Sequence, residues 1–252
     1  MFITASTLPP VAWPLPTRLL RPAPAQALVL RVSVATCEPL VAAAPQLLPP
    51  DEVVRAGRYL RAADRLRFMV ARVALRVVVS HWLGLSPALV RLGVGAHKKP
   101  YIASNPGLHF SLAHTREWVL LALAGTPLGV DVEYVDPAFP FADILPASFS
   151  SAEQLVITRA PDPHWQFYQL WTRKEALVKA TGQGIDDGLP ALPVLDGTHP
   201  SPTPSAWRLA SFAVAADHPA ALAYSIEEDW KLSFGELTPE LLQALLAGSY
   251  GK

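Results

Sequence analysis

The sequence predicts a folded protein that combines helices and strands, of the α/β or α+β class, in two halves. Of its 252 residues, 51% are hydrophobic and 17% are charged, which is too apolar for a disordered chain and sufficient for a packed core. Through Pro127 there are 14 basic and 5 acidic residues, a net +9, whereas from Leu128 onward there are 7 basic and 16 acidic residues, a net −9. Each half carries its own helix and strand patterns, so the change of charge coincides with a change of structural unit.

The opposite charges of the two halves have two interpretations. One half could bind an anionic ligand and the other a cation, or two solvated surfaces could simply differ. Several classes of protein are not expected from the rest of the composition. The single cysteine, Cys37, excludes an internal disulfide framework and favours a reducing cytoplasm. No apolar run reaches the roughly 18 to 20 residues of a membrane span, no secretory signal pattern is found, and the basic residues lack a nucleic-acid motif.

The elements of the first half follow from proline content, periodicity and capping residues. Residues 1–27 hold many prolines and are expected to be extended or turn-rich. The apolar, β-branched residues 27–34 predict the first strand, and the Pro-Pro-Asp-Glu sequence at 49–52 predicts the start of a short helix. Asp64 is expected to cap a long helix that ends at Gly84.

The boundary between the halves is predicted at a turn, Gly125-Thr126-Pro127, which lies between strand patterns. We therefore expect an N-terminal subdomain at residues 1–126 and a C-terminal subdomain at residues 127–252. The strands expected around this turn are at residues 90–94, 108–114, 118–124 and 128–134.

The second half is expected to contain a long helix between two recognisable caps. Asp162-Pro163 opens it and Gly182 closes it, and Ser150 with Glu153 predicts a capping box on a short helix before it. The remaining expected elements are a proline-rich loop at 190–204, an antiparallel strand pair at 207–215 and 220–227, and a last helix at 239–246. Each half then holds helices and about three strands, which hints at a structural duplication without a sequence repeat.

Charged residues gather on this long helix and on the strand at 128–134. In a helix, Glu175 and Lys179 lie four residues apart on one face. In a strand, Asp131 and Glu133 point to the same side because side chains alternate. Three carboxylates and an ammonium on two rigid elements could hold a hard divalent metal against phosphate oxygens. Taken singly, the two pairs equally fit a solvated strand and an ordinary helix salt bridge.

Two further features fit either an anion site or an ordinary surface. Seven arginines and one acid, Asp64, occur between Arg55 and Arg76. Arginines at this density form a solvated helix face in many proteins, and equally they could bind an anionic ligand. His114, which follows an apolar strand pattern, could be a structural histidine or a ligand contact.

Taken together and in this order, four motifs resemble the 4′-phosphopantetheinyl transferases. The motifs are Lys99-Pro100, LHFSLAHT at residues 108–115, GVDVE at residues 129–133 and WTRKEALVK at residues 171–179. The similarity is to the long, monomeric class of the superfamily, of which the surfactin synthetase activator is typical. It covers about residues 55 to 184, and the regions before and after carry little of it.

This resemblance implies a fold and a reaction. The fold is α+β, with two similar α/β subdomains related by a pseudo-twofold and coenzyme A in the cleft between them. The activity is that of a holo-[acyl-carrier-protein] synthase, which moves 4′-phosphopantetheine from coenzyme A to a serine of an apo acyl or peptidyl carrier protein. The reaction uses Mg²⁺ and releases adenosine 3′,5′-bisphosphate. Carriers of nonribosomal peptide, polyketide and fatty acid synthesis are the implied partners, and a cytoplasmic monomer is the implied form.

The resemblance also implies roles for individual residues. Asp131, Glu133 and Glu175 match the Mg²⁺ ligands. Glu175 is the implied base for the carrier serine, and Lys179 the implied contact of the departing phosphate. The residues that match coenzyme A contacts are Arg55, Arg67, Lys98, Lys99, His114, Lys174 and Lys179.

The sequence departs from the family pattern at two positions, which leaves some assignments open. Ala113 replaces a small hydroxyl residue before His114, and Lys98 replaces a common glycine, so Lys98 or Lys99 could be the binding lysine. Two other functions remain as alternatives. One is a Mg²⁺-dependent nucleotide pyrophosphatase, which would use the same carboxylates with water as the nucleophile. The other is a non-catalytic protein that binds a carrier protein or coenzyme A.

Overall fold

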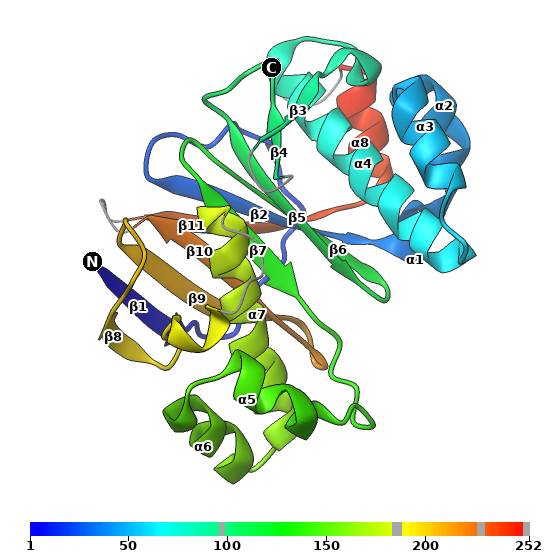
Figure 1. The fold of residues 1–252 in the computed structure, drawn as a ribbon. Coiled ribbons are helices and arrows are strands. Elements are labelled where there is room, and N and C mark those ends of the chain that lie inside the picture. The colour runs from blue at the N-terminus through cyan, green and yellow to red at the C-terminus, as the bar shows by residue number, and fades with distance from the viewer. Residues whose placement is uncertain (96–98, 183–187, 226–229, 249–252) are drawn as a thin grey trace. The chain divides into compact units, whose positions relative to one another are not determined.

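Two sheet-containing units make up the protein in the computed structural model, which describes residues 1–95, 99–182, 188–225 and 230–248 (Figure 1). Unit 1 comprises Met1–Val11, Gly95–Lys99 and Thr126–Lys231, and unit 2 comprises Ala12–Val94, Pro100–Gly125 and Leu232–Lys252. The expected mixed α+β class with two subdomains is confirmed. One boundary between the units lies at Thr126, beside the turn that the sequence predicted as the boundary. The terminal segments differ from the predicted division, because Met1–Val11 belongs to the same unit as most of the second half and Leu232–Lys252 to the same unit as most of the first half.

Unit 1 is built on a five-stranded sheet with the order β7-β10-β9-β1-β8. The strands are β1 (Phe2–Thr7), β7 (Leu128–Val132), β8 (Gly197–Pro200), β9 (Trp207–Ala215) and β10 (His218–Ser225). β1 pairs parallel with β9 and antiparallel with β8, while β10 pairs antiparallel with β7 and β9. The sequence predicted neither β1 nor β8 as a strand. β1 forms because residues 2–7 precede the first proline and alternate, with Ile3 and Ala5 buried.

The long helix α7 (Pro163–Thr181) covers one face of this sheet (Figure 1). Its caps are those expected, because Asp162 Oδ1 accepts from the backbone nitrogen of Trp165 at 3.0 Å and Gly182 adopts a left-handed φ of 69°. α6 (Ser151–Arg159) begins with the predicted capping box of Ser150 and Glu153. The remaining helical segments of unit 1 are η4 (Phe141–Ile144), α5 (Leu145–Ser148) and η5 (Leu189–Ala191).

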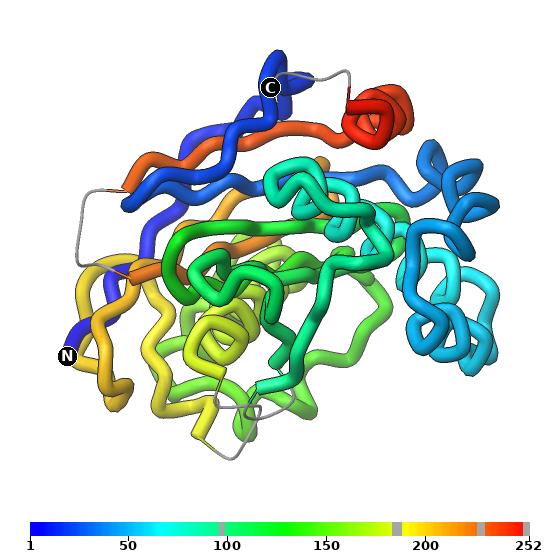
Figure 2. The backbone as a smooth tube through the Cα atoms, turned by 90° about the horizontal axis from the view of Figure 1, so that it is seen from above, coloured from blue at the N-terminus to red at the C-terminus, as the bar shows by residue number. Residues whose placement is uncertain are grey.

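Unit 2 contains a four-stranded sheet with the order β11-β2-β6-β5 and a hairpin, β3-β4. The strands are β2 (Gln26–Ser33), β3 (Leu92–Val94), β4 (Pro100–Ile102), β5 (His109–Thr115), β6 (Trp118–Ala124) and β11 (Lys231–Leu237). β6 pairs antiparallel with β2 and β5. β11 was not predicted, because it is an edge strand whose neighbour, β2, lies about two hundred positions earlier in the chain; Figure 2 shows the two segments side by side.

The helices of unit 2 pack around α4 (Ala62–Leu83), which ends at Gly84 with a φ of 64° as predicted. The predicted cap at its other end is wrong: Arg61 is the N-cap, and Asp64 lies in the first turn, where it pairs with Arg67. An acid in the first turn is favourable there because the helix N-terminus is partly positive. The other helical segments are α1 (Val34–Cys37), η1 (Glu38–Ala43), α2 (Ala44–Leu47), α3 (Pro50–Gly57), η2 (Pro87–Leu89) and α8 (Pro239–Leu246). Among the described residues, no helix has the length and apolarity required to span a membrane.

The arginine-rich stretch of unit 2 divides into a buried part and an exposed part. Arg76 is 2% exposed, donates to both carboxylate oxygens of Glu52 at 2.8 and 3.1 Å, and donates to the carbonyl of Val90 at 2.6 Å. Arg72 lies 3.6 Å from the same glutamate. These two arginines therefore join α4 to α3. Arg55, Arg58, Arg61 and Arg65 remain exposed.

Candidate active site

β7 and α7 lie in direct backbone contact because Gly129 has no side chain. A Cβ at position 129 would stand 2.0 Å from the carbonyl oxygen of Ala176 and 2.5 Å from the backbone nitrogen of Ala180. Distances that short are sterically excluded, so glycine is needed where the helix rests on the strand. Side chains alternate along a strand, and Asp131 therefore faces the same side as Gly129, toward α7.

This close approach brings Asp131 together with two residues of α7. Lys179 Nζ donates to Asp131 Oδ1 at 2.6 Å; the aspartate is buried, and the lysine side chain is 31% exposed. Glu175 lies one turn before Lys179. Burial, and next the Asp131 carboxylate, raise the pKa of Glu175, while Lys179 acts in the opposite direction. Lys179 thus pairs directly with Asp131 and acts electrostatically on Glu175. We call Glu175 and Lys179 the front face of α7.

Glu133, the third predicted metal ligand, lies just beyond the end of β7. Its backbone N–H donates to the carbonyl of Pro219 at 3.1 Å, which continues the pairing with the β10 side of the sheet. Within the ranges that the structure describes, no group of three or more His, Cys, Asp or Glu side chains is gathered as a metal site. The structure therefore brings Asp131, Glu175 and Lys179 together, and a role of Glu133 beside them stays a prediction.

The opposite side of α7 carries Arg173 and Lys174, which we call the back face. Lys174 Nζ lies 3.0 Å from Glu153 Oε2, and both side chains are 1% exposed. The same ammonium donates to the carbonyls of Leu189 and Leu192, each at 2.8 Å. An ammonium has three N–H donors, and these three acceptors account for all of them. The predicted phosphate contact of Lys174 is thus at odds with its surroundings: it holds α7 to α6 and to the chain near residue 190.

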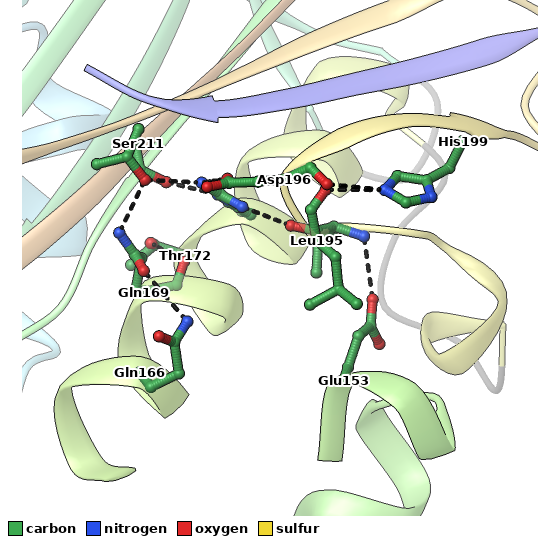
Figure 3. Close-up of polar contacts among 11 residues, drawn as sticks. Glu153, Gln166, Gln169, Thr172, Leu195, Asp196, His199 and Ser211 are labelled. Carbon is green, nitrogen blue, oxygen red and sulfur yellow. Dashed lines mark hydrogen bonds and ion pairs between the residues drawn. The ribbon is translucent and has the colours of Figure 1, made fainter. Parts of the chain in front are cut away.

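Arg173 is equally buried, at 1% exposure, and binds four groups from other elements. The groups are Ser211 Oγ at 2.6 Å, the Val194 carbonyl at 2.6 Å, Asp196 Oδ1 at 2.6 Å and Thr7 Oγ1 at 3.1 Å. Glu153 Oε1 also accepts from the backbone nitrogen of Val194, whose carbonyl accepts from Arg173, so the contacts of both back-face residues form one network. Figure 3 shows three of its members, Glu153, Asp196 and Ser211. This network fixes the rotation of the helix that presents the front face.

Lys99, a predicted coenzyme A contact, is half-buried in unit 1 and contacts backbone carbonyls. Its Nζ donates to Ala180 at 3.0 Å and to Leu128 at 3.3 Å. Burial lowers the pKa of Lys99 to about 8. Lys98, the alternative binding lysine, lies outside the described residues.

The other predicted anion-binding residues belong to unit 2. His114 is exposed at the end of β5. Arg67 Nη1 donates to the carbonyl of Arg116 at 3.2 Å, in the turn between β5 and β6, so this arginine is held at the turn that follows His114. Arg55 is exposed on α3, and its guanidinium lies 5.2 Å from the centre of the Phe68 ring. These three side chains are accessible or partly accessible, as contacts to an anionic ligand require.

Comparison with known proteins identifies the family. Residues 127–232 match the 4′-phosphopantetheinyl transferase superfamily, and residues 36–126 match the 4′-phosphopantetheinyl transferase N-terminal family. A 4′-phosphopantetheinyl transferase of Bacillus subtilis is 30% identical over 181 residues, which is 66% of this chain and 80% of that protein. The chain belongs to the 4′-phosphopantetheinyl transferase superfamily. The resemblance inferred from the four motifs is confirmed, and the protein is an enzyme of this transferase class.

More distant phosphopantetheinyl transferases are also similar. The enzyme Sfp of Bacillus subtilis (strain 168) is 28% identical over 140 residues, 55% of this chain and 62% of Sfp. The human L-aminoadipate-semialdehyde dehydrogenase-phosphopantetheinyl transferase is 28% identical over 153 residues, 55% of this chain and 49% of that protein. The chain covers less than two thirds of the length of these two relatives.

Sequence reasoning missed the residues that hold this phosphopantetheinyl transferase's active helix in place. Gly129 was used only as part of the GVDVE motif. A glycine inside a strand also indicates that another backbone segment approaches the strand closely, and this indication was missed. Glu153 was read only as part of a capping box. Its second role, as the partner of Lys174, depends on how α6 packs against α7, and no spacing in the sequence indicates it.

Proposed function

We propose that the protein transfers the 4′-phosphopantetheine arm of coenzyme A to a serine of an apo acyl or peptidyl carrier protein, with Mg²⁺, and releases adenosine 3′,5′-bisphosphate. Membership of the phosphopantetheinyl transferase superfamily supports the class of reaction. The observation that carries the residue assignment is the cluster of Asp131, Glu175 and Lys179, in which two carboxylates and one ammonium meet on α7 and β7.

The donor set of this cluster fits Mg²⁺. Asp131 and Glu175 supply carboxylate oxygens, the ligands that this ion prefers, and their mutual repulsion raises the pKa of Glu175 beyond the effect of burial. Glu133 is the proposed third ligand. Mg²⁺, when bound, would contact the pyrophosphate of coenzyme A and neutralise charge that develops as the phosphoanhydride breaks.

The front face of α7 would then move the protons of the reaction. Glu175 accepts the proton of the carrier serine hydroxyl as the serine oxygen forms its bond to the β-phosphorus of coenzyme A, the phosphorus attached to the pantetheine arm. The bond between that phosphorus and the bridging oxygen breaks at the same centre, and the electron pair leaves with adenosine 3′,5′-bisphosphate. Lys179 Nζ donates a hydrogen bond or a proton to the departing phosphate. The buried back face holds both groups in position.

Recognition of the nucleotide is assigned mainly to side chains of unit 2. His114, Arg67 and Arg55 are the proposed contacts to coenzyme A phosphates, together with Lys98 by similarity. Lys174 is withdrawn from this set because its three acceptors occupy all of its N–H donors.

A transfer assay with an apo carrier tests the proposal. The purified protein, coenzyme A and Mg²⁺ are incubated with apo peptidyl and apo acyl carriers, and intact mass spectrometry is expected to find a gain of about 340 Da on the carrier, the mass of the phosphopantetheine arm. Omitting Mg²⁺ and adding a chelator is expected to abolish the gain. Adenosine bisphosphate released equally fast without carrier would indicate a pyrophosphatase. Binding of coenzyme A or carrier without product would indicate a non-catalytic protein.

The carrier panel in that assay also addresses the physiological partner. Peptidyl, aryl, polyketide and fatty acid carriers all present the reacting serine, and the relative rates rank them. We further propose that the enzyme acts as a cytoplasmic monomer, for which a mass near 27.2 kDa in sedimentation equilibrium is the expected result.

A further inference from the structure

We propose that Lys99 is a positioning residue of the active helix. Its ammonium ties the last turn of α7 to the start of β7 and so sets Glu175 and Lys179 against Asp131. This role rests on the proposed function, because it positions the residues to which that function assigns the chemistry. It gives Lys99 a different task from the phosphate contact implied by resemblance.

The contacts of Lys99 lie on both sides of the backbone contact made by Gly129. One acceptor, the carbonyl of Ala180 at 3.0 Å, belongs to the residue after Lys179. The other, the carbonyl of Leu128 at 3.3 Å, belongs to the residue before Gly129. The two atoms bridged by Lys99 therefore belong to the residues that neighbour the helix–strand contact, and a shift of either one would change the 2.6 Å contact between Lys179 and Asp131.

The end of a helix is a favourable place for a cation. The last four carbonyls of a helix lack partners inside it and carry a partial negative charge. Ala180 is among these residues, and the chain turns away at Gly182, whose φ is 69°. A Cβ at position 182 would lie 3.6 Å from Lys99 Cδ, so the aliphatic part of Lys99 passes close to the turn. The lysine thus passes close to the helix end and donates to one of its carbonyls, that of Ala180.

The surroundings of Lys99 also argue against a free phosphate contact. Two of its three N–H donors are directed at backbone carbonyls, and the side chain is half-buried. Turning the ammonium toward a phosphate would leave the Ala180 and Leu128 carbonyls without this donor. The geometry therefore favours an effect of Lys99 on the rate of the chemical step over an effect on coenzyme A affinity.

The test separates kcat from KM in the transfer assay. Lys99→Met keeps the length of the aliphatic chain and removes the charge, and Lys231→Met, at an exposed lysine on β11, is the matched control. A small displacement of reacting groups is expected to lower kcat by about 10- to 100-fold in K99M while KM for coenzyme A changes by less than about twofold. K231M is expected to match the wild type. A raised KM for coenzyme A with unchanged kcat would overturn the positioning role.

Chemical rescue provides a second readout. In Lys99→Cys, reaction of the new thiol with bromoethylamine restores an ammonium at nearly the original distance, and recovery of kcat supports the role. Cys37 is buried, and burial raises the pKa of its thiol to about 11, so it reacts slowly in the folded protein. Failure of the modified protein to recover any kcat would count against the ammonium as the active part of the side chain.

Hydrogen exchange keeps this inference separate from the proposed function. The amide of Gly182 donates to the Val178 carbonyl at 2.9 Å and reports on the last turn of α7. Faster exchange at this amide in K99M than in wild type and K231M is the expected result, whether or not transfer is observed. Unchanged exchange would overturn the tie between α7 and β7, whereas absence of transfer in the wild type alone would overturn the proposed function.

Discussion

The back face and the front face of α7 use the same kinds of residue in opposite ways. Arg173 and Lys174 are each 1% exposed, and the hydrogen bonds and ion pairs described above join their charged groups to segments outside α7. Glu175 and Lys179 are only half-buried. Lys179 pairs with Asp131, whose carboxylate adds to the effect of burial and further raises the pKa of Glu175.

The difference separates anchoring from chemistry. A buried charge that is fully hydrogen-bonded stays in one protonation state and one position, so it can hold a helix but cannot exchange partners readily. A partly exposed cluster with more negative than positive groups can accept a cation or a proton. Adjacent residues in the chain therefore differ in role because the helix turns them toward different surroundings.

The largest expected effect concerns the front face. If it were not observed, the assignment of the chemistry to this face would be wrong. Glu175→Gln keeps the size of the side chain and removes its charge, and we expect kcat for carrier modification to fall by about 10²- to 10⁴-fold, the range for loss of a general base. The melting temperature of E175Q without metal is expected to equal or exceed that of the wild type, since the neutral side chain no longer repels Asp131. Glu38→Gln, at an exposed glutamate, is the control. A destabilised E175Q would show that Glu175 also anchors the helix.

The next effect concerns the back face. Lys174→Met leaves Glu153 as a buried carboxylate without its cation, and we expect a loss of about 3 to 5 kcal/mol in the free energy of unfolding. Denaturant unfolding measures it. In the double variant with Glu153→Gln, much of this loss should be recovered, because no unpaired charge remains. Equal losses in the single and double variants would mean that the ion pair itself contributes little.

A third change tests the contact on which both faces depend. Gly129→Ala introduces a Cβ that would stand 2.0 Å from the Ala176 carbonyl, and the helix must move away. We expect a loss of about 1 to 3 kcal/mol or more in the free energy of unfolding, as for other overpacked sites, together with reduced transfer activity. Gly57→Ala is the matched control, because a Cβ there meets nothing within 4 Å. Full activity in G129A would show that the separation of α7 and β7 does not limit the reaction.

The smallest effect concerns Lys99, which differs from both faces of α7. It is only half-buried, and in the described part of the chain it contacts backbone carbonyls and is not paired with a carboxylate. Burial lowers its pKa from 10.5 to about 8 in the folded protein. Between these values the unfolded chain binds more protons, so the contribution of Lys99 to stability increases as the pH rises through this interval. The free energy of unfolding of the wild type should therefore increase relative to that of K99M from pH 7 to pH 10. A difference that does not vary with pH would contradict the lowered pKa.

Local signals in the sequence predicted most of the helices and the order of the active-site motifs. Asp162 and Gly182 bound α7 because a side-chain acceptor at one end and a left-handed residue at the other are local requirements. The spacing of Glu175 and Lys179 placed both on one face for the same reason. The strands β1, β4, β8 and β11 were missed. β4 and β8 are short, β8 and β11 lie at sheet edges, and β1 and β11 pair with segments distant in sequence.

The sequence by itself therefore determined the family, through the order of its four motifs, and both ends of α7 and the C-terminal end of α4, because capping depends on local residue types. Only the tertiary structure decided which cations are available. Lys174 and Lys99 are both lysines in family motifs, yet one is buried beside Glu153 and the other binds the carbonyls of Ala180 and Leu128. The partners of these lysines lie in segments that are distant along the chain, and no local sequence pattern indicates that the segments are in contact.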